Sequence, residues 1–89
     1  MKGYTYTIKA QTHQSPQITY ERPGLERTQA KLLTTILARA FRSIDVINDF
    51  TGEVECQRYT GDAFFLPTTT VGDAIKEAEA VIAHDDSHN

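Results

Sequence analysis

The sequence predicts an α+β domain with the element order strand, strand, helix, strand, strand, helix (ββαββα). In four short segments, apolar and polar residues alternate, as is typical of strands with one covered face. In two longer segments, apolar residues recur at spacings of three and four, as on an amphipathic helix. The chain has 89 residues, and domains usually contain about 100–150. We therefore predict one domain, over residues 1–83.

The first two strands are predicted to form a hairpin. Residues 3–10 alternate in polarity, with Tyr4 and Tyr6 on the side that faces the core. After a polar loop, residues 17–21 alternate again, and Pro23 and Gly24 are expected to end the second strand.

The first helix is predicted from about residue 25 to residue 43. Its apolar residues give a stripe that is wide enough to lie on a sheet. The stripe consists of Leu25, Leu32, Leu33, Ile36, Leu37, Ala40, Phe41 and Ile44.

A second hairpin is predicted after this helix, with strands at 44–49 and 53–59 and a tight turn between them. In the second of these strands, Val54, Cys56 and Arg58 are expected to share one face. Cys56 is interpreted as a small buried hydrophobic residue, because cysteine on such a face is most often inert.

The second helix is predicted to begin directly after Thr70. Its hydroxyl is suited to cap the first turn, and Asp73 complements the exposed amide groups there. The apolar pattern is lost in residues 84–89, which are interpreted as a frayed polar tail.

These elements predict a mostly antiparallel sheet of about four strands, with both helices packed on one face. The strand order stays open at this stage. If the helix over 25–43 acts as a crossover connection, the central pair of strands is parallel.

Composition excludes several classes of protein. The formal net charge of −3 argues against wholesale binding of nucleic acid or anionic lipid. A single cysteine excludes an internal disulfide and a multi-cysteine zinc site. No apolar run is long enough to cross a bilayer, and we expect a cytoplasmic protein with no cofactor and no membrane partner.

Four basic residues are predicted to lie on roughly one side of the first helix. They are Arg27, Lys31, Arg39 and Arg42. Such a stripe can contact phosphates, which makes an accessory nucleic-acid-binding protein the alternative hypothesis. A solvated helix face, balanced by acidic residues elsewhere in the chain, is the simpler interpretation.

Three phenylalanines are candidates for contact with a protein partner. Phe50 is placed at the tip of the second hairpin, and Phe64 and Phe65 lie in a short apolar run between elements. Aromatic anchors dominate the energetics of interfaces, and an open sheet edge in a small domain often pairs with another chain or with a second copy. The leading hypothesis is therefore a non-enzymatic interaction or regulatory module.

No constellation in the sequence indicates catalysis or metal binding. His84 and His88 have the spacing of helical metal ligands, but they fall in the predicted tail. Glu53 and Glu55 are interpreted as a solubilising edge rather than a catalytic pair. Tyr59 is the best candidate for an exposed tyrosine that stacks on a base.

Overall fold

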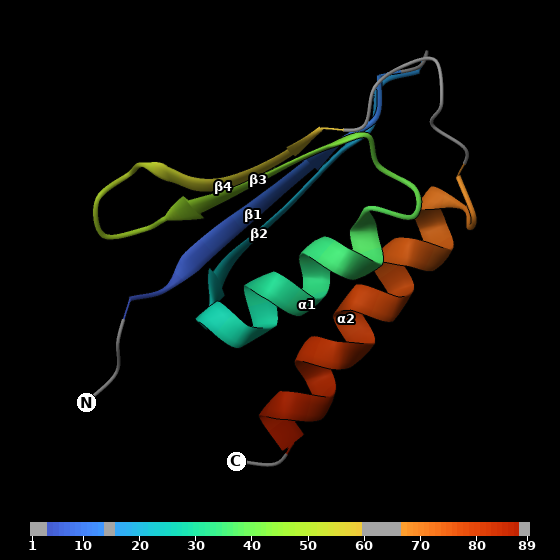
Figure 1. Cartoon of the computed structure of the whole chain (residues 1–89). Helices are drawn as coiled ribbons and strands as arrows, with labels where there is room; N and C mark the ends of the chain where they lie inside the picture. Colours follow the sequence, from blue (N-terminus) through green and yellow to red (C-terminus); the bar gives the residue numbers. More distant parts are fainter. Residues whose placement is uncertain (1–3, 14–15, 60–66, 88–89) are drawn as a thin grey trace.

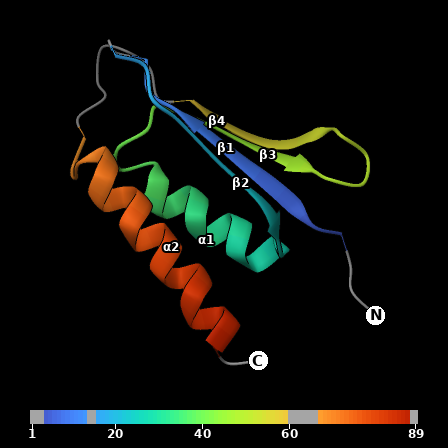
Figure 2. The same cartoon turned by 180° about the vertical axis from the view of Figure 1, so that it is seen from behind.

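The computed structural model describes residues 4–13, 16–59 and 67–87. These residues form four strands and two helices in the order ββαββα. All strand pairs are antiparallel, the sheet order is β2-β1-β3-β4, and both helices lie on the same face (Figures 1 and 2). The predicted α+β fold is confirmed. The central pair, β1 and β3, is antiparallel, so the parallel alternative does not apply.

Strands β1 (Tyr6–Gln11) and β2 (Thr19–Leu25) form the first hairpin. The sequence placed the end of the second strand too early, because β2 continues through Pro23 and Gly24. Gly24 has a φ of +72°, and the pairing register shifts at this point. Such a bulge accommodates proline, which has no N–H to donate, at a sheet edge.

Helix α1 (Arg27–Leu37) is shorter than predicted at both ends. Its start is fixed by Gln29, whose Oε1 accepts the Glu26 N–H at 3.0 Å. At its end, the Ala40 N–H donates to the Leu37 carbonyl at 3.0 Å, which tightens the chain into a turn.

The predicted apolar stripe reaches beyond this helix. Leu25 ends β2, and Phe41 and Ile44 enter the core after α1 has ended. Periodicity alone does not separate such flanking residues from helical ones. Leu32, which the stripe included, is exposed.

Strands β3 (Ser43–Asn48) and β4 (Val54–Tyr59) form the second predicted hairpin. Gly52 takes a φ of +78° in the turn, where a side chain would be strained.

Helix α2 (Val71–Ser87) begins where the sequence predicted. The Thr70 hydroxyl accepts the Asp73 N–H at 3.1 Å, which confirms the predicted cap. The helix continues to Ser87, beyond the loss of the apolar pattern, and the fraying of the 84–89 segment stays a prediction. Its fully buried alanines, Ala74 and Ala78, are small enough to let α2 approach the rest of the core closely.

Glu79 joins α2 to the edge strand β2. Its carboxylate accepts hydrogen bonds from the Arg22 guanidinium, at 2.9 Å, and from the Tyr20 hydroxyl. Burial raises the pKa of Tyr20 above its usual range, and the hydrogen bond to Glu79 raises it further. These contacts fix α2 beneath β2.

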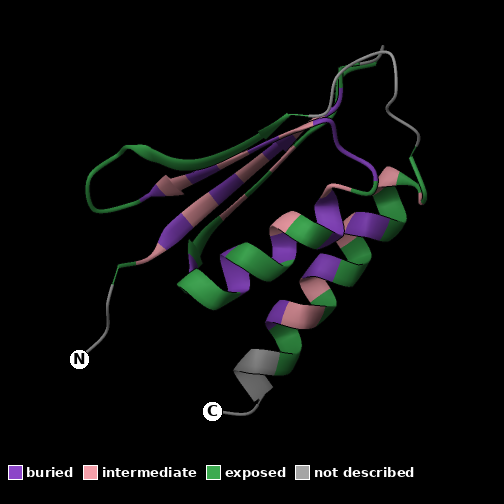
Figure 3. Ribbon diagram, viewed as in Figure 1, coloured by how far each residue is buried: buried purple, intermediate pink, exposed green. Residues whose placement is uncertain are grey.

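The core lies between the helix layer and the covered face of β1 and β3 (Figure 3). Its largest fully buried side chains are Phe41, Ile8, Leu25, Leu33, Leu37, Ile44 and Asn48. In the part of the chain that the structure describes, neither helix has the length and apolar character needed to span a membrane.

Candidate functional site

The two edge strands of the sheet differ in how they are protected. The edge formed by β2 carries Pro23 and a bulge, and α2 contacts this strand through Glu79. Proline, bulges and covering elements are the usual means by which an edge avoids pairing with another chain. By contrast, all six residues of β4 are exposed (Figure 3). The free edge of the sheet is therefore β4.

A bulge at Glu55 sets the faces of β4. Cys56 pairs with Val46, but the next pair along the strand joins Val54 to Ile47, so Glu55 is an extra residue. Val46 is buried on the helix-covered face, and Ile47 lies on the other face. Val54 and Cys56 thus lie on opposite faces, and the prediction that they share one was wrong. Cys56 and Arg58 share the helix-covered face as predicted.

Asn48 holds this bulge and the adjoining turn. Its buried side chain donates from Nδ2 to Glu55 Oε2 at 2.6 Å. Its Oδ1 accepts the backbone N–H groups of Phe50, at 2.8 Å, and Thr51, at 3.2 Å. One amide group therefore fixes both the turn conformation and the direction of the Glu55 side chain.

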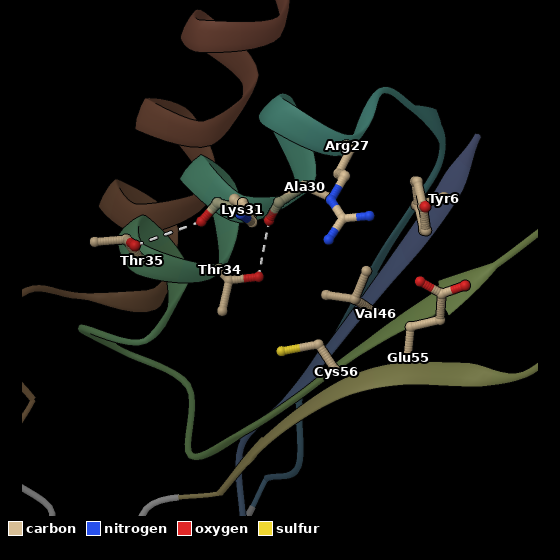
Figure 4. A pocket seen from close by; sticks show the side chains of 9 residues that line it. All are labelled: Tyr6, Arg27, Ala30, Lys31, Thr34, Thr35, Val46, Glu55 and Cys56. Carbon is tan, nitrogen blue, oxygen red and sulfur yellow. Dashed lines mark hydrogen bonds between the residues drawn. The ribbon is translucent and has the colours of Figure 1, made fainter. Parts of the chain in front are cut away.

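A groove of about 310 Å³ lies between α1 and β4 (Figure 4). Tyr6, Ala30 and Val46 give it an apolar surface, and Thr34 and Thr35 line it further along α1. From α1, Arg27 extends toward it and Lys31 lines it, and Glu55 and Cys56 face it from β4.

The groove exists because α1 packs on β1 and β3 but does not cover β4. Cys56 is consequently exposed. The prediction of a buried cysteine was wrong, because the helix layer is narrower than the sheet.

An aromatic pair lies at one end of the sheet. Phe50, at the tip of the β3–β4 hairpin, is 78% exposed and stacks on Tyr4, with ring centroids 5.4 Å apart. Tyr4 precedes β1 and is exposed rather than directed to the core. The pair is an apolar surface that a partner can contact.

On the uncovered face of β4, Val54 and Tyr59 are 50% and 55% exposed. Tyr59 was the predicted exposed tyrosine. Its ring packs edge-on against the ring of His13, with the ring centroids 5.4 Å apart. Between them, Gln57 Nε2 donates to Asp45 Oδ1 on β3 at 3.2 Å. This face of the edge strand is thus partly apolar and open to solvent.

The other predicted aromatic anchors, Phe64 and Phe65, lie outside the described residues. Of the three candidate phenylalanines, the structure therefore places only Phe50.

The predicted basic stripe is divided among different surroundings. Arg27 and Lys31 line the α1–β4 groove. Arg39 is ion-paired with Glu77 of α2 at 3.5 Å. Arg42 lies after the helix and is only 9% exposed. The structure brings together two of the four residues, not all of them.

The described residues contain no group of three or more His, Cys, Asp or Glu side chains arranged to hold a metal ion. His84 belongs to α2, and His88 lies outside the described residues. Glu53 and Glu55 do not form a matched pair, since the bulge turns Glu55 toward Asn48.

Sequence reasoning missed the groove and the difference between the two sheet edges. The bulge at Glu55 has no local signature, because the strand reads as a regular alternation through it. Pro23 was the one available signal, since proline in a strand favours an edge position.

The chain matches no protein-family model, and no curated protein or solved structure matches it.

Proposed function

We propose that the protein is a non-enzymatic protein-binding module that takes an extended segment of its partner at the free edge of β4. One observation carries the proposal: all six residues of β4 are exposed on an edge strand, whereas the opposite edge is guarded. An edge strand has backbone N–H and C=O groups that a further strand can pair with. Such pairing supplies affinity through the main chain, and side-chain pockets supply specificity.

The surroundings of β4 support this mode of binding. Val54 and Tyr59 offer apolar surface to an added strand on one face of the sheet. On the other face, side chains of the partner strand can contact apolar atoms of Val46 and Cys56 in the α1–β4 groove. The exposed Phe50–Tyr4 pair extends the apolar surface past the end of the strand.

The alternative proposal, nucleic-acid binding through the basic helix face, has less support. Arg39 is ion-paired, and Arg42 is nearly buried after the end of α1. Only Arg27 and Lys31 remain together at the groove. Two cations supply a small part of the phosphate contacts that such proteins usually make.

The proposal is tested by selecting short random peptides against the folded protein from a displayed library. Bound peptides are then located by amide shifts in NMR spectra of the labelled protein. We expect the largest shifts on β4 and on the groove residues Arg27 and Lys31. Shifts confined to β2, or to the surface of α2, contradict the proposal.

Matched edge variants make the test specific. Val54→Lys places a charge on the free edge without touching the core, and it should abolish binding. Thr19→Lys places the same charge on an exposed position of β2, and it should leave binding unchanged. Equal loss of binding in both variants counts against β4 as the binding edge.

A further inference from the structure

Strand β4 has the pattern of a self-complementary edge. In the order in which they pair with β3, the residues are Tyr59, Arg58, Gln57, Cys56 and Val54, with Glu55 as the bulge. Tyr59, Gln57 and Val54 lie on the uncovered face, and Arg58 and Cys56 lie on the helix-covered face. Gln57 is therefore the middle one of the five paired residues, with one residue of each face on either side of it.

We infer that the partner strand is β4 of a second copy, paired antiparallel about a two-fold axis that lies midway between the two Gln57 residues. This inference rests on the proposed function, and it names the partner. The result is one continuous sheet across two copies, with β4 no longer an edge in either. A two-fold contact of this kind uses the same surface on both copies.

The faces of the strand limit the register. Directly opposite residues in a sheet must share a face, so at the two-fold axis a residue has to lie opposite the same residue of the second copy, not opposite a sequence neighbour of it. Centring the axis on Arg58 sets two like charges against each other and leaves much of the strand unpaired. Centring it on Cys56 leaves both Arg58 and Tyr59 without a partner within the strand. Only the Gln57 register pairs all five residues of β4 other than the bulge residue Glu55.

In that register the side chains complement one another on both faces. Tyr59 lies opposite Val54 of the second copy, an aromatic and β-branched pair that stabilises antiparallel sheets. Arg58 lies opposite Cys56 of the second copy, beside Glu55, so opposite charges come together. Each of these contacts occurs twice because of the two-fold symmetry.

The interface area of this dimer is small, so the dimer is expected to be weak. Pairing along one strand of six residues places the interface at the lower end of the range, below about 1,200 Å². We therefore expect a reversible dimer that dissociates on dilution.

Cross-linking tests the register directly. Directly opposite residues have Cα atoms about 4.5–5.5 Å apart, which is within the range of about 4.4–6.8 Å that a disulfide requires. In a Cys56→Ser background, Gln57→Cys should therefore form a covalent dimer under mild oxidation. The control variant, Thr51→Cys in the same background, lies in the hairpin turn away from the axis and should remain monomeric. The wild-type thiols are diagonal neighbours about 7–8 Å apart and should not cross-link.

Charge reversal tests the interface without a cross-link. Arg58→Glu sets two acidic residues side by side in the dimer, and sedimentation should show a monomer. The matched control, Lys76→Glu, makes the same charge change on an exposed position of α2, away from β4, and should leave the dimer intact. Thermal unfolding of each variant checks that the fold is retained.

The outcomes separate the inference from the proposed function. Efficient cross-linking of wild-type Cys56 or of the Thr51→Cys control contradicts the Gln57 register. A wild-type monomer at every concentration overturns the inference, and the proposed function then stands if selected peptides still shift β4. If the protein is monomeric and β4 binds no peptide, both are wrong.

Discussion

Asp49 ties the start of β1 to the hairpin that carries the free edge. Its two carboxylate oxygens accept the hydroxyl groups of Thr7, at 2.5 Å, and Thr5, at 2.9 Å. Its backbone N–H donates to the Thr5 carbonyl at 2.9 Å. The hydrogen bond from Thr7, and then that from Thr5, lower the pKa of the Asp49 carboxyl below its ordinary value of 3.8.

This lowered pKa predicts part of the acid sensitivity of the fold. A carboxyl group with a depressed pKa in the folded state stabilises the protein above its unfolded pKa. That contribution is lost as the pH falls through the folded pKa. We expect Thr7→Val to move the pKa of Asp49 toward 3.8 and to weaken the dependence of unfolding on acid. NMR titration of the carboxyl carbon measures the first effect, and urea unfolding at neutral and acid pH measures the second. An unchanged Asp49 titration contradicts this account.

At the scale of elements, the β3–β4 hairpin shows which features a sequence reveals. Alternating polarity and Gly52 predicted both strands and their turn to within one residue. The same alternation placed Val54 on the wrong face, because the bulge at Glu55 depends on a hydrogen bond from Asn48. Asn48 is polar, yet it is among the most buried residues of the chain. Its role follows from packing and not from local pattern.

Asn48→Ala should therefore destabilise the protein more than the loss of an exposed polar side chain from a hairpin would. The change removes the partner of Glu55 and of two backbone N–H groups in a site that is largely buried. Unsatisfied groups of this kind cost about 1–3 kcal/mol, and we expect a loss of about 2 kcal/mol in the free energy of unfolding. Denaturant unfolding measures it. Thr28→Ala, on the exposed face of α1, is the control and should change stability by less than about 0.5 kcal/mol. An equally small effect at Asn48 argues against its role in holding the bulge.

At the scale of the whole molecule, the layers explain why one edge is free. Helix α2 is fixed beneath β2 by Glu79, and α1 packs on β1 and β3. Two helices cover less of the sheet than four strands provide, so β4 extends beyond them (Figures 1 and 2). The uncovered strand, β4, is at the edge of the sheet opposite the one that α2 contacts.

The sequence predicted the fold class because each element carries its own period. It did not predict the strand order, since the pairing of Tyr6 with Asn48 joins residues far apart in the chain and has no local signal. The candidate site was missed for the same reason. Arg27 and Cys56 line one groove because the strand order places β4 beyond β3, next to the side of α1 that carries Arg27.

Residue-resolved amide hydrogen exchange over a dilution series tests the central claim, that β4 is the edge that pairs with another strand. Exchange slows where an amide is held in a hydrogen bond that opens rarely. We predict that protection of β4 amides rises with protein concentration, whereas β2 and the helices exchange at rates that do not depend on it. Concentration-dependent protection on β2 or on a helix face, with β4 unprotected throughout, would contradict the account.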